Sequence, residues 1–366
     1  MVYPVITPEE RREKLRIPSG KIRLVLDTDA KNEVDDQFAI VWALLSQERF
    51  QVEAMYAAPF SHDCLARFFT SGDIRNASGL TYAEDPASGM QQSYEEIRKL
   101  YQMLGLCPEH RVFRGSAAYL QGDKLVASEA AQDLAARAMA GSEPLYVVAT
   151  GAATNIASAI LQNPDIIRKI VVVWLGGQPL AFGHGIEFNL MQDVRAAQVL
   201  FESGVPLVHI PCMNVASPLT VSKDEIENHV MTCGAVGRYL GQSVLDAFAN
   251  PQGAIRALPM FRKSYLLGRE DADEGYFAKF HTEHVAWSRT IWDISAVAFL
   301  KNPAWTPSTL VPAPALGEDM RWKEKGYAHE IRAVNYCYRD MIFGDLFACI
   351  RSFAEKGGIV QEGEGS

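Results

Sequence analysis

The 366-residue sequence predicts an α/β protein with an open, mostly parallel, doubly wound sheet and helices on both faces. Short apolar runs rich in β-branched residues recur along the chain, which is typical of strands buried on both faces of a parallel sheet. Segments with apolar residues at helical spacing alternate with these runs, as in successive βαβ units. The expected strands are residues 22–26, 52–58, 145–149, 170–175 and 205–210, and the expected helices are residues 35–45, 128–140, 154–161, 194–201, 291–300 and 338–355.

The remaining segments complete the expected organisation. Residues 1–20 are a polar leader, which we expect to be an N-terminal extension, and residues 21–366 form a single domain because neither a repeat nor a low-complexity linker divides them. Residues 211–290 are polar and mostly helical in pattern, which predicts a mainly helical cap region. Prolines between residues 303 and 314 predict an irregular connection. Residues 86–94 are a further candidate pocket loop.

Composition narrows the classes of partner. The net charge of −9 disfavours nucleic acid and anionic membranes, which basic proteins usually bind. The six cysteines include no CxxC pair, which predicts free thiols in a reducing compartment. No apolar run is long enough to span a bilayer, and no signal peptide is evident near the start. We therefore expect a cytoplasmic protein with no nucleic-acid or membrane partner.

Acidic residues crowd the end of the first expected strand: Asp27, Asp29, Glu33, Asp35 and Asp36. Crowded carboxylates repel one another unless a cation compensates them, and hard divalent cations prefer oxygen ligands. Ligands of open α/β sheets bind beyond the carboxyl ends of the strands, where this cluster lies. The cluster therefore predicts a divalent-metal site that activates water for hydrolysis. In the plainer alternative, Asp35 only caps the following helix and the other carboxylates form a solvated loop.

The spacing of the aspartates resembles the N-terminal signature of the inosine–uridine-preferring nucleoside hydrolases, with two extra residues between Asp29 and Asp35. Three further stretches fit that family in the right order, so that the resemblance covers about residues 22–300. They are residues 147–155, residues 172–177 followed by Glu187, Phe188 and Asn189, and residues 290–296. The pair Asp27 and Asp29 also resembles the aspartates of haloacid-dehalogenase-like phosphatases, although Lys31 stands where that family has Thr or Val.

The resemblance implies Ca²⁺-dependent hydrolysis of the N-glycosidic bond of a ribonucleoside or related N-riboside, which releases base and ribose, as in nucleoside salvage. It also implies that the protein binds a small-molecule nucleoside or N-riboside and that it forms a homodimer or homotetramer. Asp29 would be the general base. The implied metal ligands are Asp29, Asp36, the Thr150 carbonyl and Asp293, the implied ribose-binding residues are Asp35, Glu187 and Asn189, and Asp27 would orient the ligands from behind.

Two departures from the family pattern concern the leaving base. Leu175 stands where a methionine is common, and Trp292 where several members carry a histidine. His284 and Trp292 are therefore the candidates for a base or leaving-group pocket, with His281 as a neighbour. The departures also leave open a catalytically weak ribose- or nucleoside-binding protein.

Overall fold

The computed structural model describes residues 2–17, 19–64, 81–249, 288–324 and 329–360. Within them, eight strands form one sheet: β1 (Ile22–Thr28), β2 (Phe50–Ala57), β3 (Val112–Arg114), β4 (Leu145–Ala149), β5 (Ile170–Leu175), β6 (Leu207–Ile210), β9 (Ser308–Pro312) and β12 (Glu330–Val334). Their order is β3-β2-β1-β4-β5-β6-β12-β9, and every neighbouring pair is parallel except β12 and β9. The predicted open, mostly parallel sheet is confirmed.

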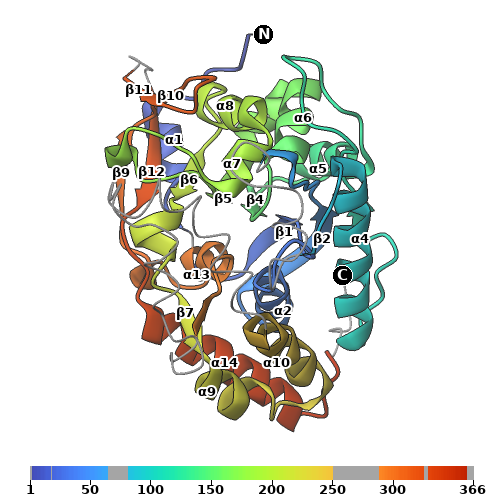
Figure 1. Cartoon of the computed structure of the whole chain (residues 1–366). Coiled ribbons are helices and arrows are strands. Elements are labelled where there is room, and N and C mark those ends of the chain that lie inside the picture. Colours follow the sequence, from blue (N-terminus) through green and yellow to red (C-terminus); the bar gives the residue numbers. More distant parts are fainter. Residues whose placement is uncertain (1, 18, 65–80, 250–287, 325–328, 361–366) are drawn as a thin grey trace, which may run out of the picture.

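Helices cover both faces of the sheet (Figure 1). Along β1, Leu24 and Leu26 belong to one apolar core and Val25 to the other, because successive side chains of a strand point to opposite faces. The first core is closed by α2 (Asp36–Leu45), α4 (Pro86–Met103), α10 (Gly234–Ala249), α13 (Ile294–Lys301) and α14 (Arg339–Glu355), and the second by α5 (Glu129–Ala140), α6 (Thr154–Gln162) and α8 (Val194–Glu202). The doubly wound arrangement is therefore also confirmed.

The described part of the predicted cap region is mainly helical. It contains α9 (Lys223–Glu225) and α10, and Leu240 and Val244 of α10 pack into the first core. A two-stranded antiparallel ribbon, β7 (Thr220–Ser222) with β8 (Ser288–Thr290), was not predicted. Two further short ribbon strands, β10 (Ala315–Leu316) and β11 (Trp322–Lys323), pair with each other beyond β9.

Two expectations about the connections change. The proline-rich stretch predicted to be irregular contains β9, which pairs with β12, and Pro312 ends this edge strand where the sheet tolerates a proline. The prediction of a pocket loop at residues 86–94 is wrong, because these residues form the first half of α4, with Asp85 as the N-cap. The polar leader contains α1 (Pro8–Lys14), whose Arg12 pairs with Glu330 at 2.8 Å.

The described helices include none with both the length and the apolar character that crossing a bilayer requires.

Candidate active site

The candidate site lies at the carboxyl ends of β1 and β4, the two central strands at which the strand order reverses. In open α/β sheets this switch point forms a crevice, because the connections on its two sides leave in opposite directions. The backbone N–H of Thr150, just after β4, donates to the carbonyl of Asp27 at 2.9 Å. The ends of the two strands are thereby joined, and Asp29 and Thr150 both follow directly after them.

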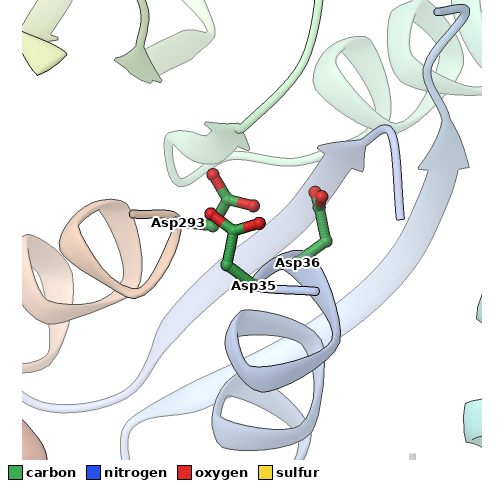
Figure 2. Close-up of side chains that lie close together, drawn as sticks. All are labelled: Asp35, Asp36 and Asp293. Atoms are coloured by element: carbon green, nitrogen blue, oxygen red, sulfur yellow. The ribbon is translucent and has the colours of Figure 1, made fainter. Parts of the chain in front are cut away.

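Three carboxylates from distant parts of the chain converge beside this crevice. Asp35 and Asp36 come from the start of α2, and Asp293 from the start of α13 (Figure 2). One oxygen of each lies within 4.8 Å of the others, so the three could hold a metal ion, and all three are buried. Asp35 occupies the N-cap position of α2 without a side-chain cap hydrogen bond. Asp35 therefore has the predicted cap position but does not cap the helix with its side chain, and the solvated loop of that alternative is wrong, because the other aspartates of the cluster are buried.

Hydrogen bonds fix how two of the three carboxylates point. Asp36 accepts from the hydroxyls of Thr28 and Thr150, the latter at 3.1 Å. Asp35 accepts from the backbone N–H of Trp292 at 3.0 Å, which ties α2 to the residue before Asp293. The cluster is therefore built by β1, β4 and the approach to α13 together.

Burial and mutual repulsion raise the pKa values of the carboxylates in this cluster. Burial raises the pKa of Asp35 and of Asp293 well above the usual value, and the neighbouring carboxylates raise both further. Burial also raises the pKa of Asp36, to about 6, although the hydroxyls of its threonine partners oppose the shift. Arg289 is the cation that lowers the pKa of Asp35, and its own guanidinium pairs with Glu33 at 2.5 Å. Oxygen ligands, burial and mutual repulsion together fit a hard divalent cation.

Asp29 lies next to this group without belonging to the converging three. It is buried, and its Oδ2 has no hydrogen-bond partner among the described residues. Burial raises its pKa well above normal, and the charges of Asp36 and Asp35 add to the shift. A Cβ on Gly151 would lie 3.2 Å from the Asp29 Cγ and 2.9 Å from the Ala58 Cβ, so the glycine makes room for this carboxylate.

Asp27 is placed behind the cluster. It lies inside β1 rather than after it, and its Oδ1 accepts from the side chain of Asn155 at 3.3 Å. Asn155 also donates to the carbonyl of Ala57 and accepts from Ser116, so it links three segments under the site. Burial raises the pKa of Asp27 to about 8. The side chain is thus in a supporting position, beneath the switch point.

The predicted substrate residues Glu187 and Asn189 also reach the crevice. Glu187 caps α7 (Phe188–Gln192) and accepts from the backbone N–H groups of Gly177, Asn189 and Leu190 at 2.7, 2.9 and 3.1 Å. Burial raises its pKa to about 7, against those hydrogen bonds. The Asn189 amide donates to the carbonyls of Thr150 and Leu175, both at 3.1 Å. Its side-chain oxygen is left to accept.

The predicted leaving-group residues are placed only in part. Trp292 is half-buried and packs against the first core, while its backbone holds Asp35. His284 and its neighbour His281 lie outside the described residues.

The sequence reasoning missed how the longer loop after Asp29 is held. Glu33 pairs with Arg289, and Lys31 lies 3.4 Å from the buried Glu96 of α4. It also missed His62, a buried histidine shortly after the end of β2. The rule that pointed to the polar residues after β1 and β4 applies equally to β2, and would have pointed to the segment that carries this residue.

Comparisons with known proteins show a family and a shared fold. The sequence profile of the inosine-uridine preferring nucleoside hydrolases matches residues 24–321. A pyrimidine-specific ribonucleoside hydrolase, RihA of Citrobacter koseri, is 30% identical over 109 residues, which are 29% of this chain and 34% of that enzyme. The chain thus matches about a third of that relative's length.

Solved structures share the fold over nearly the whole chain. A purine-preferring ribonucleoside hydrolase from Gardnerella vaginalis has a TM-score of 0.63 at 19% identity, covering 92% of this chain and 100% of that one. An inosine-uridine preferring nucleoside hydrolase from Bacillus anthracis has a TM-score of 0.57 at 14% identity, covering 90% and 99%. With the profile matched over most of the chain, this protein belongs to the inosine-uridine preferring nucleoside hydrolase family.

Proposed function

We propose that this protein is a Ca²⁺-dependent hydrolase of the N-glycosidic bond of a ribonucleoside or related N-riboside, which releases base and ribose. The observation that carries the proposal is the group of buried, mutually repelling carboxylates at the switch point of a chain in this family. Such a group is costly to bury unless a cation accompanies it. An all-oxygen donor set suits Ca²⁺, which takes six to eight oxygen ligands.

The residues that would hold the cation are Asp29, Asp36, the carbonyl of Thr150 and Asp293, and Asp35 lies within reach of the same position. The Thr150 carbonyl already accepts one hydrogen bond from Asn189, which leaves its second lone pair available. When bound, the cation would neutralise the carboxylates and lower the pKa of a neighbouring water.

Asp29 is the general base of the proposed reaction. Its Oδ2 has no protein partner in the described part of the chain, so it is free to accept a proton from water. The water oxygen attacks C1′ of the sugar as the C1′–N bond breaks, and the electron pair of that bond leaves with the base. Asp27 supports the strand end from which Asp29 projects.

Asp35, Glu187 and Asn189 would orient the ribose. The Asn189 oxygen and the lone pairs of Asp35 can accept from sugar hydroxyls, which holds C1′ beside Asp29. The three backbone donors to Glu187 fix its position at the edge of the crevice. We also propose that the protein forms a homodimer or homotetramer and is cytoplasmic. His284 and Trp292 are the proposed residues of the base pocket.

The test is release of reducing sugar from inosine, guanosine, adenosine, uridine and cytidine, each with Ca²⁺ and with excess chelator. We expect turnover of at least one nucleoside, lost with chelator and restored by added Ca²⁺. Absence of release from every nucleoside, together with Ca²⁺-dependent ribose binding in calorimetry, would favour the ribose-binding alternative instead.

The phosphatase alternative makes a separate prediction. It requires turnover of a phosphomonoester that is lost in Asp27→Asn. The position of Asp27 inside β1 and its hydrogen bond from Asn155 speak for a supporting residue, because a nucleophile has to be open to the phosphate. Turnover of 4-nitrophenyl phosphate would contradict our proposal.

A further inference from the structure

The chain that follows β2 forms a second wall of the crevice. The backbone N–H of Ala58 donates to the carbonyl of Thr28 at 2.9 Å, so β2 leads into the same crevice as β1. Four residues later lies His62, which is 1% exposed. None of the functional roles implied by the family pattern falls on this histidine.

The His62 ring is held by aromatic neighbours. It stacks on Tyr82 with ring centroids 5.5 Å apart, lies 5.6 Å from Phe188, and meets Phe60 edge-on at 6.0 Å. Phe188 belongs to α7, the helix that also carries Asn189, so the His62 ring packs against this helix. The loop that carries the aspartates also contacts this wall, because Thr81 donates its backbone N–H to the carbonyl of Asn32 at 2.9 Å.

Hydrogen bonding decides which ring nitrogen of His62 carries the proton. Nδ1 accepts from the backbone N–H of Ala83 at 3.2 Å, so in the neutral ring the hydrogen is on Nε2. Burial lowers the pKa of His62, which keeps the ring neutral at physiological pH. The Nε2 atom is buried and has no partner within the described ranges. A buried donor without an acceptor is costly, and a ligand that supplies the acceptor removes the cost.

A second donor of the same kind lies next to His62. The Oε1 of Gln192 accepts from the backbone N–H of Ser61 and from the Tyr119 hydroxyl, each at 2.9 Å. These two bonds orient the amide, so its Nε2 is a donor, and this atom too is buried without a partner in the described residues. Two oriented donors without acceptors, on one wall of a crevice, match a ligand that carries acceptors.

We propose that His62 contacts the leaving base, donating from neutral Nε2–H to an acceptor atom of that base, with the Gln192 amide as a second donor. The inference rests on the proposed nucleoside hydrolysis and adds the residue that stabilises its leaving group. When the C1′–N bond breaks, its electron pair passes to the base, and the donated hydrogen bond stabilises that negative charge. His62 keeps its proton, and the departing base takes one from solvent.

The experiment compares two leaving groups. Uridine and inosine release a base anion that needs hydrogen-bond donors, whereas 4-nitrophenyl β-D-ribofuranoside releases a nitrophenolate that spreads its charge through the nitro group. In His62→Phe the stacked ring is kept and the donor removed. We expect kcat/KM for the nucleosides that the protein turns over to fall about 100-fold, and kcat/KM for the nitrophenyl riboside to fall less than about 3-fold.

Further variants keep the comparison decisive. His62→Asn retains an acceptor for Ala83 and removes the donor, so it replaces the Phe variant if that one does not fold. His62→Gln carries an amide N–H near the Nε2 position, and it should regain part of the lost nucleoside activity. His229→Phe is the control for a histidine outside the crevice, because this exposed side chain stacks on Phe347, with centroids 5.2 Å apart.

The outcomes separate this inference from the proposed function. Equal losses on both substrates would mean that His62 only supports the fold, and unchanged nucleoside turnover would mean that it makes no contact with the base. Either result overturns the inference and leaves nucleoside hydrolysis standing. If the unmodified protein with Ca²⁺ hydrolyses neither compound, the proposed function fails as well.

Discussion

The crevice holds two sets of buried carboxylates that are stabilised in opposite ways. The carboxylates of Asp35, Asp36 and Asp293 converge, and repulsion from neighbouring carboxylates adds to the effect of burial on the pKa of Asp35 and of Asp293. Glu187 is equally buried, but it receives three backbone N–H groups at the start of α7. The first group therefore favours a cation from outside the chain, whereas the backbone of α7 and Gly177 supplies the hydrogen-bond partners of Glu187.

This difference distinguishes two roles that a buried acidic residue can have. A carboxylate with its own backbone donors is a structural element that a ligand can also use. A group of carboxylates that repel one another despite a few donors favours a cation site, because an added cation balances the negative charge that remains. Substitutions and ligands should therefore act differently on the two sets.

The largest expected effect is on catalysis at the carboxylate cluster. Asp29→Asn keeps the shape of the side chain and removes the base, so kcat for the best nucleoside should fall about 1,000-fold. Asp133→Asn is the control, because this half-buried aspartate lies on α5, outside the crevice. It accepts hydrogen bonds from Tyr56 of β2 and from Arg137 of α5. Steady-state kinetics at saturating Ca²⁺ measure both. A loss under about 10-fold in Asp29→Asn would remove this residue from the role of base.

The next effect is on stability. A cation that binds the folded state alone adds about 2.7 kcal/mol at 100 times its Kd, so Ca²⁺ should raise the Tm by several degrees. Asp293→Asn should abolish this rise, and its metal-free form should unfold at the same or a higher Tm, because one repelling charge is gone. Glu187→Gln should keep the rise. Differential scanning fluorimetry across a Ca²⁺ series checks all three, and a rise that depends on Glu187 would contradict the distinction.

The pH dependence of stability should separate the two sets further. Folded Glu187, with a pKa of about 7, and Asp27, with a pKa of about 8, hold protons that the unfolded chain releases near pH 4. The folded state then binds more protons, so the stability they contribute is complete below about pH 4 and is lost as the pH rises through about 7 to 8. Urea unfolding without metal should give a larger free energy of unfolding at pH 5.5 than at pH 8.5.

Added Ca²⁺ should flatten this slope only in part. The cation replaces the protons on the cluster, whereas the backbone donors to Glu187 are unchanged by it. A slope that disappears completely with Ca²⁺ would show that Glu187 contributes nothing, and a metal-free slope of the opposite sign would contradict the raised pKa values.

The fold was predictable where one local pattern determines the structure. β4 and β5 have their predicted bounds because each is an unbroken apolar run, fully buried. β9 and β12 were missed because they lie toward the edge of the sheet, where half-buried positions such as Arg332 interrupt the apolar pattern. β3 has three residues, too few for a periodicity.

The candidate site divides in the same way. Asp29 and Thr150 directly follow strands, so the crevice rule and the family pattern both point to them, whereas the family pattern alone points to Asp293. The pair of Glu33 with Arg289 joins residues 256 positions apart, which no local pattern reveals. A single histidine such as His62 says little in a sequence, since its meaning depends on the N–H of Ala83 that fixes its tautomer.

The smallest expected effect concerns Glu187, the carboxylate that is hydrogen-bonded by the backbone. In Glu187→Gln one side-chain oxygen can still accept from Gly177 and Leu190, while the amide that replaces the other oxygen cannot accept from Asn189. One hydrogen bond is lost, and the free energy of unfolding should fall by about 1 kcal/mol at pH 5.5. At pH 8.5 the difference should shrink or reverse, because the variant no longer has a buried group to ionise. Equilibrium unfolding at both pH values measures this change, and a loss of more than about 3 kcal/mol would mean that the charge of Glu187, rather than its acceptor geometry, supports the start of α7.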